Sequence, residues 1–330
     1  MLTTDGTYTV IDSHTAGHPT RVILSGVPRL AGDTVLAMRD NFRDRHDHLR
    51  ARLLHEPAGH AAMVGLVPVP SDRADYGAFF ISSYVYLDMC GHATIGYAKT
   101  LAATGAIAAP LESFTLETPA GVVTVGLRWA PDGSLDRAII RNVPCYVGYE
   151  RVDVALPDGR KVRADLAFGG IWYAIVDAAP LGLTLDDTNA SAAMALGATI
   201  KRALGDALAG LDPAKGGASV PSVLFYQETG PHRARHLLVL AENKFDRSPC
   251  GTGTSARMAL LAHRGEIDDA TTYIADNLLG VSFRARIAAR VVEHGQPAII
   301  PEIEGQAFIT AFSTIVKEAG DPLTAGFLCR

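Results

Sequence analysis

Two related stretches decide the fold of this chain: Asp88-Met89-Cys90-Gly91-His92-Ala93-Thr94-Ile95-Gly96 and Asp246-Arg247-Ser248-Pro249-Cys250-Gly251-Thr252-Gly253-Thr254-Ser255-Ala256. Each places a cysteine and a glycine directly before a predicted helix. The helix dipole and the unpaired backbone N–H groups at a helix N-terminus favour a thiolate, so we expect the pKa of both thiols to be lowered. Two such thiols predict one site with a sulfur atom on each side.

The other predicted elements repeat in the same order around these stretches. A rough apolar stripe predicts a helix over 34–54, and an amphipathic pattern predicts a second helix over 189–208. A buried strand over 77–87 leads to Cys90, and two further strands lead to Cys250. Strand, Cys-Gly turn and helix thus occur twice, each time after a long helix.

This order indicates an internal duplication, and the two cysteines are 250 − 90 = 160 residues apart. We expect the first half to comprise residues 1–134 together with about 315–330, and the second half to comprise residues 135–314. Halves related by a pseudo-twofold axis would bring equivalent helix N-termini face to face across a cleft.

Composition excludes several classes of protein. The 330 residues are 48% hydrophobic and 20% charged, with a net charge of −5, and no basic patch points to nucleic acid or to a membrane surface. No apolar run reaches the length of a membrane span, and the first residues do not resemble a secretory signal. The cysteines lie far apart and form no CxxC pair, so we expect a cytoplasmic protein without a disulfide framework. They are Cys90, Cys145, Cys250 and Cys329.

A metal site is the first alternative to consider. Asp47 lies between His46 and His48, which are common metal ligands. Adjacent positions on a helix point to different sides, however, so we interpret this segment as a solvated helix face and predict no metal.

The paired thiols suit one kind of chemistry. One thiolate removes a proton from a carbon atom while the opposite thiol returns one, which inverts a stereocentre without a cofactor. The simpler interpretation is that both cysteines are small buried hydrophobic residues. Backbone N–H groups at the two helix starts would hold a substrate carboxylate. Asp246 would bind a substrate ammonium or cap its own turn. The residues offering these N–H groups are Gly91, His92, Gly251 and Thr252.

Other functions stay open at this point. Cys90 and His92 could form a nucleophile pair, but positions this close rarely give the needed geometry and no third orienting residue is visible. We therefore favour His92 as a hydrogen-bond donor or polar wall. Residues 251–256 fit the loose dinucleotide pattern G-x-G-x-x-A, so a Rossmann dehydrogenase is a competing enzyme class. A non-catalytic ligand-binding module is the non-enzyme alternative. Loss of either thiol separates these possibilities, because it should abolish racemisation but not hydride transfer or binding.

The two stretches resemble the signatures of the proline racemase family. Further landmarks make the resemblance cover almost the whole chain: Asp12-Ser13-His14-Thr15, Glu56-Pro57 with Gly59-His60, and Asp321-Pro322 with Gly326-Phe327. The resemblance implies an α/β (α+β) protein with the diaminopimelate-epimerase-like fold. In that fold each of two pseudo-symmetric halves is a mostly antiparallel sheet or barrel around a central helix.

The resemblance also implies inversion at Cα of proline or a hydroxyproline, without pyridoxal phosphate or metal. By position, Cys90 and Cys250 become the acid/base pair, and Asp246 holds the ring nitrogen. The carboxylate falls to the four N–H residues named above. We expect His14, Phe168, Trp172 and Tyr173 to wall the pocket, although core packing explains the aromatic residues equally well. We expect Cys145 and Cys329 to be inert, and a homodimer is left open.

The substrate is less firmly indicated than the reaction. Family members that dehydrate trans-3-hydroxy-L-proline usually have threonine in place of Cys250, so two thiols favour the racemase and epimerase branch over this alternative. His18 stands where Glu or Asn is common, and Ala58 where Arg is common. The 4-hydroxyproline epimerases carry a histidine near Pro221–Ser222, which this chain lacks. This difference leaves proline and 3-hydroxyproline open.

Overall fold

The computed structural model describes residues 3–212, 215, 220, 222–241 and 244–329. Contacts between Cα atoms divide the chain into two compact units, residues 1–140 with 306–330 (unit 1) and residues 141–305 (unit 2). The sequence-based boundaries differ from these, since they assigned strand β8 (Leu135–Arg141) and most of strand β18 (Ala307–Glu318) to the second half. That the two halves are separate domains stays a prediction.

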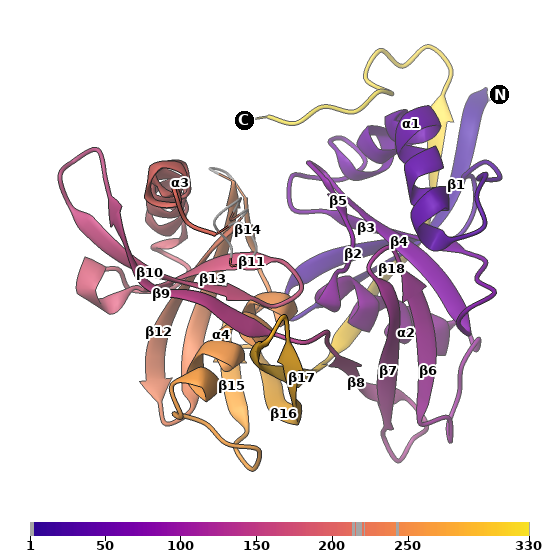
Figure 1. The fold of residues 1–330 in the computed structure, drawn as a ribbon. Coiled ribbons are helices and arrows are strands. Elements are labelled where there is room, and N and C mark those ends of the chain that lie inside the picture. The colour runs from indigo at the N-terminus through magenta and orange to yellow at the C-terminus, as the bar shows by residue number, and fades with distance from the viewer. Residues whose placement is uncertain (1–2, 213–214, 216–219, 221, 242–243, 330) are drawn as a thin grey trace. The chain divides into compact units, whose positions relative to one another are not determined.

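Unit 1 is a mostly antiparallel sheet with two helices (Figure 1). Its strands pair in the order β18-β1-β2-β3-β4-β6-β7-β8, and β5 also pairs with β4. Only β2–β3 and β4–β6 are parallel among these pairs. The bounds of the remaining elements are β1 Thr4–Thr15, β2 His18–Ile23, α1 Val35–Leu54, β3 Val64–Val69, β4 Tyr76–Ser82, β5 Tyr86–Leu87, α2 Gly91–Ala103, β6 Ser113–Thr118 and β7 Gly121–Trp129.

Unit 2 repeats this topology. Its strands pair in the order β9-β10-β11-β12-β13-β15-β16-β17, β14 also pairs with β13, and the pairs β11–β12 and β13–β15 are parallel. The elements are β9 Tyr146–Ala155, β10 Lys161–Phe168, β11 Trp172–Asp177, a short 3-10 helix Ala179–Leu181, α3 Ala190–Ala207, β12 Ser222–Gly230, β13 Arg233–Ala241, β14 Lys244–Asp246, α4 Gly251–His263, β15 Tyr273–Asp276, β16 Ser282–Glu293 and β17 Gln296–Gly305.

The two units therefore correspond element by element. In each, a long helix (α1 or α3) follows a strand that pairs in parallel with the next one, and a second helix (α2 or α4) begins just after a short strand. The predicted internal duplication is confirmed at the level of topology. The antiparallel character of both sheets contradicts the Rossmann alternative, which needs a parallel sheet.

The second helix of each unit is its central element. Small and apolar residues make up much of α2 and α4, and most positions of both helices are buried. A helix that is apolar all round is one that a fold encloses on every side. Each central helix therefore has a fixed N-terminus, and this is where Cys90 and Cys250 lie.

The long helices pack on the outside of each sheet. Val35, Phe42 and Leu53 of α1 join an apolar core with β1, β2, β3 and β4, and Ile200 of α3 joins the equivalent core of unit 2. Thr34 caps α1, because its hydroxyl accepts a hydrogen bond from the Ala37 N–H at 3.1 Å. Both helices match their predicted spans to within one residue at each end.

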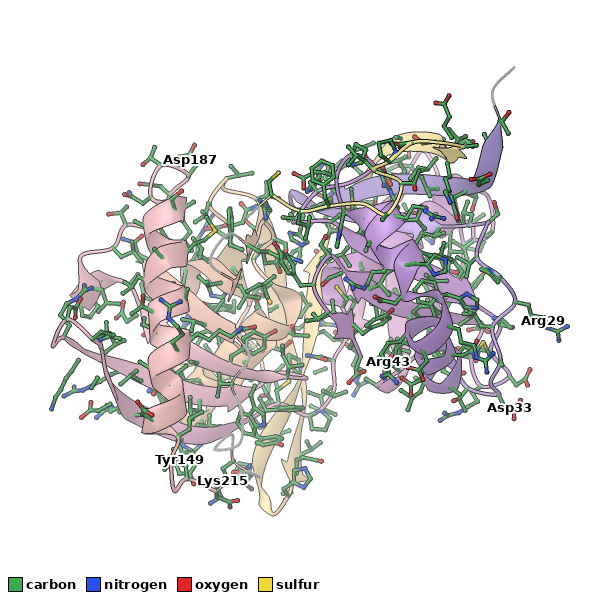
Figure 2. The ribbon with its side chains drawn as sticks, turned by 90° about the horizontal axis from the view of Figure 1, so that it is seen from above. Arg29, Asp33, Arg43, Tyr149, Asp187 and Lys215 are labelled. Carbon is green, nitrogen blue, oxygen red and sulfur yellow. The ribbon has the colours of Figure 1, made fainter. Side chains whose placement is uncertain are left out.

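Figure 2 shows α3 with Asp187 near its start and with Tyr149 and Lys215 near its other end. Beyond that end, the Tyr149 hydroxyl accepts a hydrogen bond from the Asp212 N–H at 2.9 Å. In the described part of the chain no helix is long and apolar enough to cross a membrane.

The predicted single strand over 77–87 is wrong. The chain turns after Ser82, whose hydroxyl accepts hydrogen bonds from the N–H groups of Tyr84 and Val85. The result is a hairpin of β4 and β5, in which Phe80 pairs with Leu87. The apolar run hid this turn because Tyr84 and Val85 themselves carry large side chains that favour strands.

Candidate functional site

Cys90 is the N-cap residue of α2 and lies in extended backbone, with φ −145° and ψ 104°. Its side chain is 7% exposed and makes no capping hydrogen bond to the helix. The sulfur atom lies 3.3 Å from Nδ1 and 3.9 Å from Nε2 of His92. The imidazole is therefore a polar group next to this thiol, although we expected residues this close in sequence rarely to meet in this way.

The first turn of α2 is fixed from the sheet. The Thr15 hydroxyl donates a hydrogen bond to the His92 carbonyl at 2.8 Å, and the ring of His18 meets the ring of His92 edge-on at 4.4 Å. His14, a predicted wall residue, accepts a hydrogen bond from the Gly17 N–H and packs against Phe308. In the sequence His18 is only a departure from the family pattern, and its contact with His92 could not be predicted from it.

Cys250 is the N-cap residue of α4, but its backbone is different. Its φ of +64° and ψ of 106° lie in a region that residues other than glycine rarely adopt. The Cys250 N–H donates to the Ser248 hydroxyl at 3.1 Å, and the sulfur accepts from the Gly253 N–H at 3.2 Å. A strained residue held by such contacts is typical of a functional position.

Two hydroxyl groups complete the surroundings of the Cys250 sulfur atom. The Tyr173 and Thr252 hydroxyl oxygens lie 2.6 Å apart, and each is 3.7 Å from that sulfur. Tyr173 comes from strand β11 and is 1% exposed. It is thus a neighbour of both Cys250 and Thr252.

Burial raises the pKa of the Cys250 thiol to about 12, and the nearby Asp246 carboxylate adds to this shift. The hydrogen bonds from Gly253, Tyr173 and Thr252 act in the opposite direction. The expectation of a lowered pKa is therefore wrong for this thiol, because desolvation outweighs the helix terminus. A thiol with a pKa in this range is protonated at neutral pH.

Asp246 lies at the end of β14 and is 7% exposed. Its carboxylate accepts a hydrogen bond from the Ser248 N–H at 2.8 Å. Asp246 therefore caps its own turn, as one of the two interpretations of the sequence predicted. Burial nevertheless raises the pKa of Asp246 to about 6. A carboxyl group held in this way ionises more readily when a cation binds beside it.

His236, which the sequence analysis did not single out, supports the Cys250 turn. The pKa of His236 is lowered to about 4, first by burial and then by the charge of Arg257. The neutral ring donates from Nδ1 to the Pro249 carbonyl at 3.2 Å, and its Nε2 accepts from the Tyr273 hydroxyl at 3.0 Å. His236 therefore fixes the residue that precedes Cys250.

Gly169 lets the β10–β11 turn approach the start of α4. A Cβ atom at Gly169 would lie 2.1 Å from the Thr252 carbonyl oxygen and 2.8 Å from the Ala256 nitrogen. The Asn142 side-chain amide donates to the Gly169 carbonyl at 2.8 Å and holds this turn in place. The Gly169-Gly170 pair was visible in the sequence, but nothing there showed what it approaches.

The other predicted wall residues of unit 2 form a separate aromatic cluster. Phe168 stacks on Tyr146 at 5.2 Å between ring centroids, and Trp172 meets both rings edge-on. Core packing explains them here, and a role as pocket wall stays a prediction.

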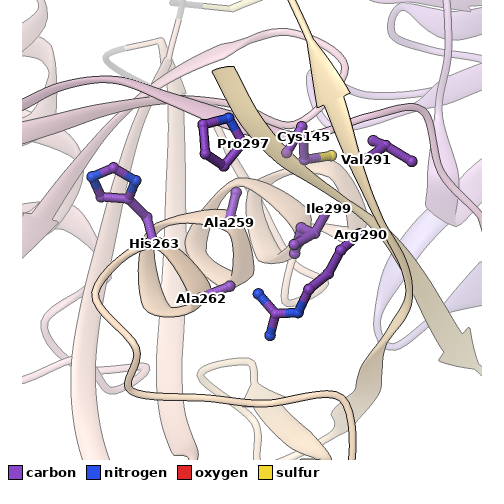
Figure 3. A pocket seen from close by; sticks show the side chains of 9 residues that line it. Cys145, Ala259, Ala262, His263, Arg290, Val291, Pro297 and Ile299 are labelled. Carbon is purple, nitrogen blue, oxygen red and sulfur yellow. The ribbon is translucent and has the colours of Figure 1, made fainter. Parts of the chain in front are cut away.

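Cys145 and Cys329 lie elsewhere. Cys145 is fully buried, donates from sulfur to the Val143 carbonyl at 3.1 Å, and has its pKa raised by burial, which keeps the thiol neutral. Together with His263 and Arg290 it lines a pocket of about 80 Å³ beside the C-terminal half of α4 (Figure 3). Cys329 is exposed near the end of the chain.

Three further sequence features have structural partners. The Asp47 carboxylate is held by Arg50 and by the Tyr86 hydroxyl, so its oxygens are engaged in an ion pair. The Ala58 carbonyl accepts a hydrogen bond from Arg21 at 2.7 Å, and the same guanidinium binds Asp12. The missing histidine belongs near Pro221–Ser222. Pro221 lies outside the described residues, and Ser222 is the buried first residue of β12.

Comparison with known proteins identifies relatives along the whole chain. The model of the family described as "Proline racemase" matches residues 10–328. A 4-hydroxyproline 2-epimerase of Streptosporangium roseum is 36% identical and covers 99% of this chain and 100% of its own length. A proline racemase of Clostridioides difficile is 34% identical over 97% of both chains.

Solved structures support the same fold. A hydroxyproline epimerase from Agrobacterium vitis, with bound trans-4-hydroxy-L-proline, has a TM-score of 0.86 at 27% identity and covers 98% of this chain and 96% of its own. A phenazine biosynthesis protein of the PhzF family from Bacillus anthracis has a TM-score of 0.63 at 14% identity, covering 94% and 99%. The predicted diaminopimelate-epimerase-like fold is confirmed.

Proposed function

Because the chain belongs to the proline racemase family and is therefore an isomerase of the racemase and epimerase class, we propose that it inverts Cα of free proline or a hydroxyproline without a cofactor. One observation carries the mechanism. Topologically equivalent helices, α2 and α4, each begin at a buried cysteine followed by glycine. A two-base inversion requires such a pair, with one thiol on each side of the same carbon atom.

The two thiols start from different protonation states in this proposal. Cys250 is the acid, since burial keeps its proton in place, and Cys90 is the thiolate. An N–H of the His92 ring at 3.3 Å would stabilise that thiolate. Cys90 removes the Cα proton as Cys250 delivers its own to the opposite face. The reverse reaction uses the two sulfur atoms in exchanged roles.

The substrate carboxylate is assigned to the helix N-termini. Backbone N–H groups of Gly91, His92, Gly251 and Thr252 are the donors that α2 and α4 offer at their first turns, and the helix dipoles favour an anion there. These donors also stabilise the negative charge that develops when Cα loses its proton.

Asp246 is assigned to the ring nitrogen. Its pKa of about 6 would fall when a cationic ring nitrogen binds beside it, so binding itself would ionise the carboxyl group. His14, Phe168, Trp172 and Tyr173 remain the proposed walls. We also place the enzyme in the cytoplasm, where its free cysteines suit a reducing environment.

The second candidate is dehydration of trans-3-hydroxy-L-proline in the same site. Removal of the Cα proton is common to both reactions, and loss of the 3-hydroxyl group then competes with reprotonation. A thiol at position 250 favours inversion, because it returns a proton to Cα. A homodimer stays a prediction.

Proton NMR in D₂O separates these outcomes. The enzyme is incubated without added cofactor with L-proline, trans-4-hydroxy-L-proline and trans-3-hydroxy-L-proline in turn. Deuterium at Cα together with a second stereoisomer establishes inversion and identifies the substrate. Loss of the 3-hydroxyl group as an imine establishes the dehydratase. Absence of exchange with all three substrates rejects the proposed function.

A further inference from the structure

The hydroxyl groups beside Cys250 suggest a role that the general two-thiol scheme does not contain. We propose that Tyr173 is a positioning residue, whose hydroxyl fixes the Thr252 side chain and with it supplies a hydroxyl proton to the Cys250 sulfur whenever that sulfur is a thiolate. This inference rests on the proposed function, because it assumes that Cys250 alternates between thiol and thiolate during inversion.

The three groups form a closed arrangement. A separation of 2.6 Å between the Tyr173 and Thr252 oxygens means that one hydroxyl donates to the other. Whichever donates, the proton of the other hydroxyl is free to point at the sulfur, because both oxygens lie 3.7 Å from it. With the Gly253 N–H at 3.2 Å, a thiolate would gain two donors, one from the backbone and one from this pair.

The phenol acts as a donor and not as a third base. Tyr173 is 1% exposed, and burial, together with the Cys250 sulfur, holds its pKa well above the usual range. The phenol is therefore protonated at neutral pH. The backbone of this residue is fixed in strand β11, where Tyr173 pairs with Ala167 of β10 and with Ser222 of β12. The direction of the hydroxyl is thus set by the core of unit 2.

The charged and titratable groups that face Cys250 from the other packed elements of unit 2 have defined states. Asp246 of β14 makes a thiolate less favourable when it is ionised. His236 of β13 is neutral above about pH 4 and holds the Pro249 carbonyl. The groups that lower the pKa of the Cys250 thiol include the Gly253 N–H and the hydroxyl groups of Tyr173 and Thr252.

Tyr173→Phe removes the hydroxyl group and keeps the ring. The matched control is Tyr226→Phe, which removes a buried phenol hydroxyl from the neighbouring strand β12, where Tyr226 packs against Arg257 and not against Cys250. Each protein is treated with iodoacetamide between pH 7 and 9, and the labelling rates of the Cys250 and Cys90 peptides are followed by mass spectrometry. Only the thiolate reacts, so the rate reports its population.

We expect Tyr173→Phe to lower the Cys250 labelling rate about tenfold, the order for one lost hydrogen bond to a charged group. Tyr226→Phe should leave it unchanged. A purely structural role would give the opposite sign, because a loosened α4 would expose the thiol and speed its labelling. An unchanged or faster Cys250 rate in Tyr173→Phe therefore overturns the inference.

Catalysis provides the second readout. Tyr173→Phe should lower kcat about tenfold in the wild-type background but much less in a Thr252→Val background, because the two hydroxyls act as one unit. If Tyr173→Phe lowered kcat by the same factor with and without Thr252→Val, the two hydroxyl groups would act independently and the positioning role would be overturned. Failure of the proposed function is a distinct result, since wild type would then show no exchange in D₂O whatever the labelling rates are.

Discussion

The starts of α2 and α4 occupy equivalent positions in two units of the same topology, yet their surroundings differ. Cys90 has extended backbone and an imidazole beside its sulfur atom. Cys250 has a positive φ, and its sulfur is surrounded by a backbone N–H and two hydroxyl groups. The two thiols therefore lie at the same position in the duplicated topology, but the backbone conformation and the polar neighbours of each sulfur atom differ.

This difference fits what an inversion needs from its two bases. A symmetric pair of thiols would have no preference as to which one holds the proton. An imidazole stabilises a thiolate by donating to it, whereas the buried surroundings of Cys250 favour the neutral thiol. The unequal environments would thus define one resting state, with the proton on Cys250, from which one direction of the reaction starts.

The largest expected effect comes from the thiols themselves. Cys90→Ser and Cys250→Ser should each lower kcat for inversion by about 10²–10⁴-fold, because a serine hydroxyl is a far weaker base than a thiol. Conversion of each stereoisomer is measured separately by polarimetry, with exchange into D₂O as a second readout.

Cys329→Ser is the control, since Cys329 is exposed and should have no part in catalysis. Full activity in either of the first two variants would rule out the two-thiol mechanism. A much larger loss in one variant than in the other, with activity lowered in both, would show that the two thiols contribute unequally to the reaction.

Tight packing against the two helices is the next difference. A Cβ atom on Gly169 would lie 2.1 Å from the Thr252 carbonyl oxygen, which is a backbone atom of α4. A Cβ atom on Gly96 of α2 would lie 2.9 Å from the Ser13 hydroxyl, which is a side-chain atom. A side chain yields more easily than backbone. We expect Gly169→Ala to cost about 3 kcal/mol of unfolding free energy and Gly96→Ala about 1 kcal/mol.

Urea unfolding gives both values. Gly205→Ala in α3 is the control, because nothing lies within 4 Å of its Cβ position, and alanine there should stabilise the protein by about 0.5–1 kcal/mol. Equal costs at Gly169 and Gly96 would mean that the α4 start adapts as readily as the α2 start.

The sequence predicted the central features of this fold because local signals carried them. The helix spans of α1 and α3 follow from their apolar periodicity, and the positions of Cys90 and Cys250 before α2 and α4 follow from the Cys-Gly turns. The hairpin at Ser82 was missed because a side-chain hydrogen bond makes that turn.

What the sequence did not predict depends on contacts between distant residues. The raised pKa of Cys250 results from burial by several strands, and a helix-terminus argument considers only the local chain. His236 reaches Pro249 across 13 residues, and Tyr173 reaches Thr252 across 79. No local pattern specifies which buried polar side chains meet in this way.

The smallest expected effect concerns pH and is confined to the α4 side of the comparison. The pKa of Asp246 is raised from 3.8 to about 6, so the folded state holds a proton that the unfolded state releases, and this contribution to stability falls as pH rises from about 4 to 6. The pKa of His236 is lowered from 6.5 to about 4, so its contribution rises over nearly the same range. In the wild type the two slopes offset each other.

Removing one member of this pair should reveal the other. In Asp246→Asn only His236 still titrates, so the free energy of unfolding should rise by about 2 kcal/mol relative to wild type between pH 4 and 6.5. His236→Gln should leave one that falls by a similar amount between pH 4 and 6. Urea midpoints measured at half-unit steps of pH test both signs within one series. If both variants kept the wild-type profile, neither group would titrate differently in the folded state. The buried groups around Cys250 would then add no pH dependence to the stability of the protein.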